Sequence, residues 1–306
     1  MFIKLIVFII MKFNIKKITP FILSGVLLVS CGSNENSDKQ EIDKNLLDPT
    51  NSLKTDFDGK IFSIPSPIQM ALLLKETNAP FNQELLGNSD NSSKYSSEYK
   101  QALNLGITGA DLGYASINNQ NSATLNCLSK LEYLINKLGL DGMFDKSLTT
   151  RFEKNITNTD SVLVIVSEAF RNGDNYLKKK KRKHTSSLIL TGGWIESIYF
   201  ACEINKTSKN NKITERIAEQ QQTLTTVIEI LNEYNTENEN DELIKDLTDL
   251  KVSFDQIKID YNFVAPKTDQ KNKITTIQHT TTVKVDDKIL KEITEKIISI
   301  REKIIN

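Results

Sequence analysis

The chain has 306 residues, of which 25% are charged, and its basic and acidic residues balance at 39 each. We expect the first thirty residues to be removed, which takes away four lysines and leaves 35 basic residues against 39 acidic ones, a net charge of −4. A mildly acidic chain gives no electrostatic reason to expect nucleic acid as a partner.

The first thirty residues have the pattern of a secretory signal peptide. A basic segment, MKFNIKK (11–17), precedes an apolar segment, ITPFILSGVLLVS (18–30), that is too short to span a bilayer. The segment ends in LVSC (28–31), which resembles the bacterial lipobox, and the resemblance implies cleavage before Cys31 and lipidation of that cysteine. An ordinary signal peptide with an incidental cysteine is the alternative. A second apolar run, MFIKLIVFII, precedes the basic segment, so we expect translation to start at Met11 rather than at Met1.

The residues after Cys31 predict where the protein is held. The lipidated cysteine of lipobox precursors carries several acyl chains, such as palmitate, and more than one chain anchors stably. Position 32 is Gly rather than Asp, which resembles the sorting signal for the outer membrane; the membrane face, periplasmic or external, is left open. Residues 31–60 are polar and without periodicity, which predicts a flexible, disordered tether.

From residue 61 onward nearly every segment has helical periodicity, so we predict an all-α, multi-helix, bundle-like fold. We expect a buried-helix core domain over 61–206 and a C-terminal helical bundle part over 207–306. Ser66 and Pro67 are typical of an N-cap and a first helical residue. Further helices are expected over about 93–117, 122–138 (ended by Gly139), 147–155, 159–179 (capped by Asn158 or Thr159) and 185–205.

Two surface segments interrupt this pattern. KKKKRK (178–183) is predicted to be a solvated helix end and turn, with contact to phospholipid or lipopolysaccharide head groups as the alternative. The threonine-rich segment 261–287 is expected to be a long surface loop, with a short hairpin as the alternative.

Three C-terminal stretches carry heptad stripes of the kind that packs antiparallel helices. The stripes are Ile213, Ile217, Gln220, Leu224, Val227, Leu231 and Tyr234; then Leu243, Leu247, Leu250, Phe254 and Ile257; then Leu290, Ile293, Ile297, Ile300 and Ile304.

Motifs that carry chemistry are missing from the sequence. No GxSxG, HExxH, Walker, CxxC or EF-hand pattern occurs. His184 and His279 have no partner at ligand spacing, so both are expected at the surface, and no metal or other cofactor is predicted. Cys127 and Cys202 fall on apolar helix faces and are predicted to be buried free thiols, with a disulfide as the alternative.

The stretch ALNLGITGADLGYA (102–115) contains three glycines in an apolar run. No strand or lysine accompanies them, which argues against a phosphate loop. In a helix, Ala102, Gly106, Gly109 and Gly113 share one bare face, against which the row Gly193, Ser197 and Ala201 could pack closely. Three interior glycines cost about 3 kcal/mol, which packing must offset. We predict one continuous helix; the alternative is a break near Gly106 with a new helix from Thr108.

Polar residues in these buried helices form the candidate site. Asn104, Thr108 and Asp111 lie on another side of the same helix, and Glu196 lies beside Trp194. A buried Asp needs a cation or several donors, and we expect Arg151 or Arg171 to supply it. The five residues Asn104, Thr108, Asp111, Trp194 and Glu196 are predicted to form a structural polar network, with a ligand pocket or a catalytic acid pair as alternatives.

Three motifs, SIPSPIQMALLLK (63–75), ALNLGITGADLGYA (102–115) and LTGGWIESIYF (190–200), follow the lipobox in this order. Together they resemble a family of all-helical lipoproteins of the Bacteroidota over about residues 60–235. The resemblance implies a helical fold and lipid anchoring. It carries over no activity and no catalytic residue.

These patterns lead to an expected function. The chain is expected to be an outer-membrane, lipid-anchored envelope protein that binds or scaffolds an envelope partner rather than an enzyme. The alternative is a periplasmic or surface protein that binds a small ligand, or an enzyme, and uses the Asp111/Glu196 region.

Overall fold

The computed structural model describes residues 53–57, 60–64, 66–87, 94–141, 146–155, 158–277 and 280–306, and Ile42–Asn306 form one compact unit. The predicted signal peptide, Cys31, most of the tether and His279 lie outside the described residues. The chain is predominantly helical, which confirms the predicted fold class.

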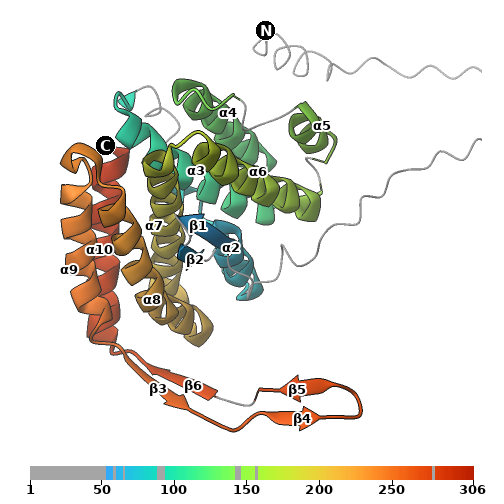
Figure 1. The fold of residues 1–306 in the computed structure, drawn as a ribbon, viewed down its shortest axis with the longest axis vertical. Coiled ribbons are helices and arrows are strands. Elements are labelled where there is room, and N and C mark those ends of the chain that lie inside the picture. Colours follow the sequence, from blue (N-terminus) through green and yellow to red (C-terminus); the bar gives the residue numbers. More distant parts are fainter. Residues whose placement is uncertain are drawn as a thin grey trace, which may run out of the picture. The chain divides into compact units, whose positions relative to one another are not determined.

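Figure 1 shows the elements in chain order. They are β1 (Leu53–Phe57), β2 (Lys60–Ile64), α2 (Pro67–Glu76), a 3-10 turn (Gln83–Leu85), α3 (Glu98–Ile117), α4 (Asn121–Lys137), α5 (Lys146–Asn155), α6 (Thr159–Lys179), α7 (Lys183–Ser208), α8 (Asn211–Glu233), a second 3-10 turn (Thr236–Asn238), α9 (Asp241–Phe254), β3 (Lys258–Asn262), β4 (Lys267–Asp269), β5 (Ile274–Thr276), β6 (Thr280–Lys284) and α10 (Asp287–Ile305).

Helices α3 and α7 pack on each other at the centre of the described fold, and α2, α4, α6, α8 and α10 pack around them. Every residue of α3 from Gln101 to Ile117 is buried, because apolar and small residues surround this helix on all sides. The α3 helix is continuous, so the predicted single helix is confirmed and the break near Gly106 is wrong. Tight packing offsets the cost of the glycines.

The glycines of α3 do not share one seam, so that expectation is wrong. A Cβ on Gly106 would lie 2.0 Å from the carbonyl oxygen of Ile189 in α7, whereas one on Gly109 would lie 1.9 Å from the ring of Phe170 in α6. Gly113 faces Ile68 of α2. Gly113 lies about 10 Å along the axis from Gly106, and at that level a different helix covers the same side.

On the α7 side, the closest approach is made by a residue outside the predicted small-residue row. A Cβ on Gly192 would lie 2.0 Å from the carbonyl oxygen of Leu103. Gly193, which belongs to the predicted row, lies opposite Gly106 and Pro67. The α3–α7 contact therefore brings backbone against backbone at Gly106 and Gly192, where any side chain would force the helices apart.

The C-terminal helices confirm the heptad prediction. The stripe residues of α8, α9 and α10 are buried, with Tyr234 and Leu290 partly so. Helix α10 packs on both α9 and α7, and α8 packs on α7 and α9. Helices from both sides of position 206 therefore contribute to one hydrophobic core.

Two segments contain strands, although the leading predictions for them were a tether and a loop. Residues 53–64, assigned largely to the tether, form the antiparallel hairpin β1–β2 with Leu53 opposite Ile64. The sequence Asp58–Gly59 between the strands is a strong hairpin signal. The predicted loop 261–287 overlaps strands β3 to β6, in which β3 pairs with β6 and β4 with β5, so the hairpin alternative holds in place of the loop.

Several local predictions are confirmed. Asn158 caps α6, and KKKKRK is a helix end and turn between α6 and α7. Gly139 follows α4 at a φ of +62°, and Leu140 donates to Ile135 as in a Schellman motif. Cys127 and Cys202 are buried free thiols. His184 differs from its prediction: it is partly buried, with Nε2 3.2 Å from Oδ1 of Asn240.

Candidate functional site

Two of the predicted site residues meet in the core. Asp111 on α3 and Glu196 on α7 are 1% and 0% exposed. The charge of Glu196 acts on the Asp111 carboxyl strongly enough to raise its pKa. The helices that hold them approach closely at Gly106 and Gly192, so the tight α3–α7 contact positions the acid pair.

The cation that balances this pair comes from α10. Arg301 forms a two-pronged ion pair with Glu196, with Nε 2.6 Å from Oε2 and Nη2 2.7 Å from Oε1. The expectation that Arg151 or Arg171 would serve Asp111 is wrong: Arg151 pairs with Glu168 and Arg171 is exposed. Arg301 directly follows the stripe residue Ile300, and this buried position was the signal that sequence analysis missed.

Further groups hold Arg301 in place. Its Nη2 also donates to the carbonyl oxygen of Leu85 at 3.0 Å, and its Cζ lies 4.0 Å from the ring centre of Tyr199. Stacking on an aromatic face and a two-pronged carboxylate contact are the interactions for which a guanidinium is suited. Arg301 is thus a fixed tertiary link between α10, α7 and the segment before Gly87.

Asp111 has its own set of neighbours. Its Oδ2 accepts a hydrogen bond from the backbone N–H of Gly87 at 3.2 Å. A Cβ on Gly87 would lie 3.1 Å from that oxygen and 3.3 Å from Nζ of Lys130, a buried residue of α4. The absence of a side chain at position 87 therefore lets the backbone reach the carboxyl. Within the described residues no hydrogen bond reaches the other oxygen, Oδ1.

Burial sets the protonation of this cluster. Burial, and next the charge of Glu196, raise the pKa of Asp111 well above its ordinary value, although Lys130 and Arg301 oppose the shift. A proton on Asp111 removes the repulsion that two ionised carboxylates would have in the core. Burial alone would lower the pKa of Arg301, but Glu196 and Asp111 raise it, so Arg301 stays charged.

The other three predicted site residues do not join the acid pair. Asn104 Nδ2 donates to the carbonyl oxygens of Lys100 and Ile304, and the second bond links α3 to the end of α10. Thr108 donates to Asn104 of its own helix at 2.7 Å. Trp194 points to α8, where Nε1 donates to Gln220 at 3.2 Å. The five predicted residues therefore form no single network: Asn104 and Trp194 make separate contacts with other helices, and Thr108 bonds within α3.

These buried groups are poorly suited to reaction with a ligand from solvent. Glu196 is engaged at both oxygens, and burial raises the pKa of the nearby Cys127 thiol and lowers its reactivity. Burial likewise raises the pKa of Tyr95 to about 12. In the part of the chain that the structure describes, no three His, Cys, Asp or Glu side chains gather as a metal site would require.

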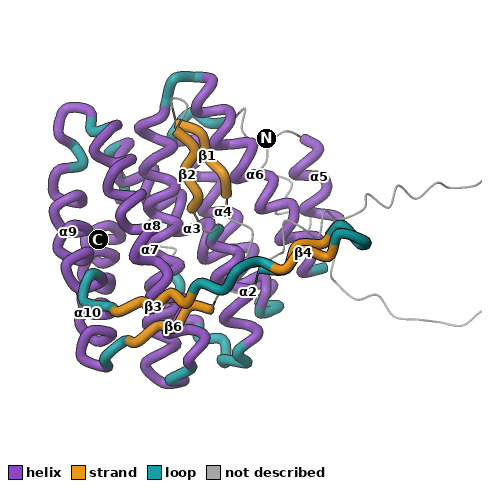
Figure 2. Tube along the Cα trace, turned by 60° about the horizontal axis from the view of Figure 1, so that its bottom comes forward, coloured by secondary structure: helices purple, strands orange, loops and turns teal. Residues whose placement is uncertain are grey.

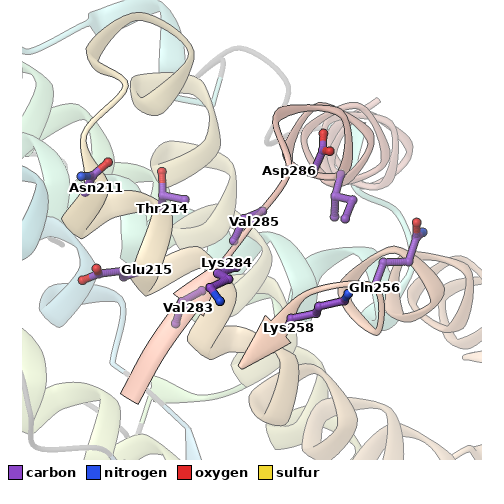
Figure 3. A pocket seen from close by; sticks show the side chains of 10 residues that line it. Asn211, Thr214, Glu215, Gln256, Lys258, Val283, Lys284, Val285 and Asp286 are labelled. Carbon is purple, nitrogen blue, oxygen red and sulfur yellow. The ribbon is translucent and has the colours of Figure 1, made fainter. Parts of the chain in front are cut away.

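A solvent-open cleft lies elsewhere, where the β3–β6 strands join the helices (Figure 3). Its volume is about 620 Å³. The first turn of α8 contributes Asn211, Thr214 and Glu215, and the end of α9 and start of β3 contribute Gln256 and Lys258. Val283, Lys284, Val285, Asp286 and Ile289 complete the lining.

The lining of this cleft is mixed in charge and lacks a nucleophile activated by a base. Lys258 and Lys284 are opposite each other in the β3–β6 register, and Glu215 and Asp286 supply negative charge. The lining includes no histidine, cysteine or serine. Such a surface is suited to polar binding rather than to covalent catalysis.

Comparison with protein-family models, with curated proteins and with solved structures finds no match. Assignment of function therefore depends on the sequence patterns and on the geometry above. Across the described helices, none combines the length and the apolar character needed to cross a membrane.

Proposed function

We propose that this protein is a lipid-anchored protein of the bacterial envelope, attached to the outer membrane through Cys31, that binds or scaffolds a partner and is not an enzyme. Support for the anchor comes from the lipobox resemblance of residues 28–31 and from the apolar segment that precedes it. The resemblance to all-helical lipoproteins of the Bacteroidota points in the same direction.

The observation that carries the binding role is the contrast between closed core and open surface. The acid pair that a catalytic function would use is buried and held by Arg301. The cleft offers polar groups that solvent reaches, among them Lys258 of β3, Lys284 of β6 and Glu215 of α8. A partner is therefore expected to bind at the cleft and not at Asp111.

Anchoring is tested in cells by substitution of the predicted lipidation site. The wild-type chain is expected to incorporate labelled palmitate and to fractionate with the outer membrane, and Cys31→Ala is expected to lose both properties. Palmitate labelling that survives Cys31→Ala would contradict the proposal.

Partner binding is tested by a photo-crosslinking amino acid placed in the cleft at Thr214. The matched control places the same amino acid at Leu125, an exposed apolar residue of α4. In intact cells, a discrete crosslinked species is expected from position 214 and not from position 125. Equal crosslinking from both positions would contradict a partner site at the cleft.

The alternative function, a small-ligand protein or enzyme that uses Asp111 and Glu196, has its own test. Under the scaffold proposal, Asp111→Asn changes stability and leaves partner crosslinking intact. A variant that keeps its fold but loses a bound metabolite or an activity would favour the alternative and exclude the scaffold.

A further inference from the structure

Residues 258–277 and 280–284, here called the ribbon, form a two-stranded segment that projects beyond the ends of α8, α9 and α10 (Figures 1 and 2). From Lys258 to Ile277 every residue is exposed except the partly exposed Val264. The strands are therefore open to solvent on both faces over this stretch. The hairpin of β4 and β5 is exposed along both strands, and such a hairpin is marginally stable in water, which indicates that this outer part of the ribbon acts against a surface outside the chain.

The ribbon carries most of the exposed large apolar side chains of the described residues. The described residues include seven exposed large apolar side chains, and five of the seven belong to the ribbon, with exposed fractions from 40% to 68%. They are Ile259, Tyr261, Phe263, Ile274 and Ile277. Ile259 and Tyr261 alternate along β3 and so share one face of the ribbon. A concentration of this kind marks an interaction surface.

The charge of the ribbon is opposite to that of the rest of the protein. The ribbon contains five lysines and two aspartates, a net charge of +3. Since the chain after Ser30 has a net charge of −4, the remainder carries −7. Both aspartates are engaged: Asp260 pairs with Lys284, and Asp269 accepts hydrogen bonds from Lys271 and Asn272 at the tip.

A lipid surface fits this combination better than a partner strand does. Lysines along an edge strand discourage pairing with another strand, so the open edges are poorly suited to β-augmentation. Aromatic and aliphatic side chains flanked by lysines are typical of segments that lie in a membrane interface, where the apolar groups enter and the ammonium groups reach lipid phosphates.

We propose that the ribbon is a second membrane contact, which inserts the side chains of Tyr261, Phe263, Ile274 and Ile277 into the interface of an anionic bilayer while Lys267, Lys271 and Lys273 bind the lipid phosphates. The proposal rests on the proposed function in one respect: the lipid anchor holds the ribbon close to the bilayer, so a weak contact suffices. Together the two contacts orient the folded part on the membrane.

The test uses the lipidated full chain reconstituted into vesicles of equal parts phosphatidylglycerol and phosphatidylcholine that carry bromine on their acyl chains. Bromine quenches tryptophan only within the bilayer. The native chain has one tryptophan, Trp194, which is buried in the core and serves as the background. Phe263→Trp adds a reporter on the ribbon, and Leu125→Trp adds the matched reporter on α4.

Brominated lipid is expected to lower the fluorescence contributed by position 263 at least twofold and to leave positions 125 and 194 unchanged. Lys267→Glu/Lys271→Glu/Lys273→Glu in the Phe263→Trp background is expected to abolish the quenching, as is the use of phosphatidylcholine alone. Quenching that is absent at 263, equal at 263 and 125, or unaffected by these charge changes overturns the proposal.

Two further outcomes distinguish the ribbon contact from the proposed lipid anchor and from contact between copies of the chain. Flotation of the chain with vesicles reports the lipid anchor. A chain that fails to float but is quenched at position 263 on anionic vesicles would overturn the proposed anchor and support the ribbon contact. A change in the fluorescence of position 263 with protein concentration in detergent, without quenching on vesicles, would assign the ribbon to contact between copies of the chain and overturn the lipid proposal.

Discussion

The acid pair and the ribbon are opposite in their chemistry. Around Asp111 and Glu196, charged groups are enclosed in the core, and around Phe263, large apolar groups are exposed to solvent. The buried charges are balanced by Arg301 from another helix, whereas the apolar side chains of the ribbon keep 40% to 68% of their surface open to solvent. A polar group that its own fold satisfies is typically structural, and an apolar group that its own fold leaves open is typically an interaction site. The comparison therefore assigns structure to the core and interaction to the ribbon.

The largest effect is expected from removal of the buried cation. Arg301→Met leaves the Glu196 carboxylate buried without its partner, which should lower the free energy of unfolding by about 3–5 kcal/mol. The matched control, Arg151→Met, breaks the partly exposed pair with Glu168 and should cost less than about 1 kcal/mol. Urea unfolding, monitored by circular dichroism, measures the loss of stability in both variants. Equal losses of stability in the two variants would show that the buried ion pair of Arg301 contributes no more than a partly exposed one.

The next effect tests the close α3–α7 contact that positions the pair. Gly106→Ala places a Cβ against the backbone of α7 and should destabilise by about 1–3 kcal/mol, after an offset of up to about 1 kcal/mol from helix propensity. Gly113→Ala is the control on the same helix, because its Cβ would meet Ile68 Cγ1 at 3.4 Å, and it should be neutral or slightly stabilising. Gly106→Ala is expected to have a lower melting temperature than Gly113→Ala. The reverse order would contradict the backbone contact at Gly106.

A smaller, pH-dependent effect is expected at Asp111. Its folded pKa is raised above the ordinary value of 3.8, so the native state holds the proton more tightly than the unfolded chain does. The resulting stabilisation is complete below the unfolded pKa and is lost as pH rises through the folded pKa. Asp111→Asn cannot lose a proton, so its stability relative to wild type should increase as pH rises above about 4, by about 1.4 kcal/mol per unit of the pKa difference.

Denaturant unfolding from pH 4 to pH 8 measures this slope. A relative stability of Asp111→Asn that falls with rising pH would mean that Asp111 is ionised and stabilising in the core.

The smallest effect is expected on the ribbon. Phe263 is 68% exposed, so Phe263→Ser should change the free energy of unfolding by no more than about 0.5 kcal/mol. In the core, Phe200 stacks on Tyr114 with ring centres 4.6 Å apart, and Phe200→Ala should cost about 3–5 kcal/mol. Thermal unfolding of the two variants compares them directly. A loss above about 1 kcal/mol at position 263 would show that the chain itself covers this side chain.

The sequence by itself determined the helical class and most helix positions, because periodicity, caps and heptad stripes are local properties. Ser66, Asn158 and Gly139 act at the helix ends where their chemistry predicts. The burial of Asp111 and Glu196 also followed from the apolar residues around them. The Asp58–Gly59 signal was available too, although it was assigned to the tether.

Only the tertiary structure decided which groups meet. Arg301 lies 105 residues from Glu196, and no local pattern encodes that separation. For the same reason the glycines of α3 face three different helices, although their spacing suggested one seam. Pairing of β3 with β6 also joins residues as far as 26 positions apart, as for Lys258 and Lys284. Local sequence sets which face of an element is apolar, and the packing of all elements together selects the neighbour that each face receives.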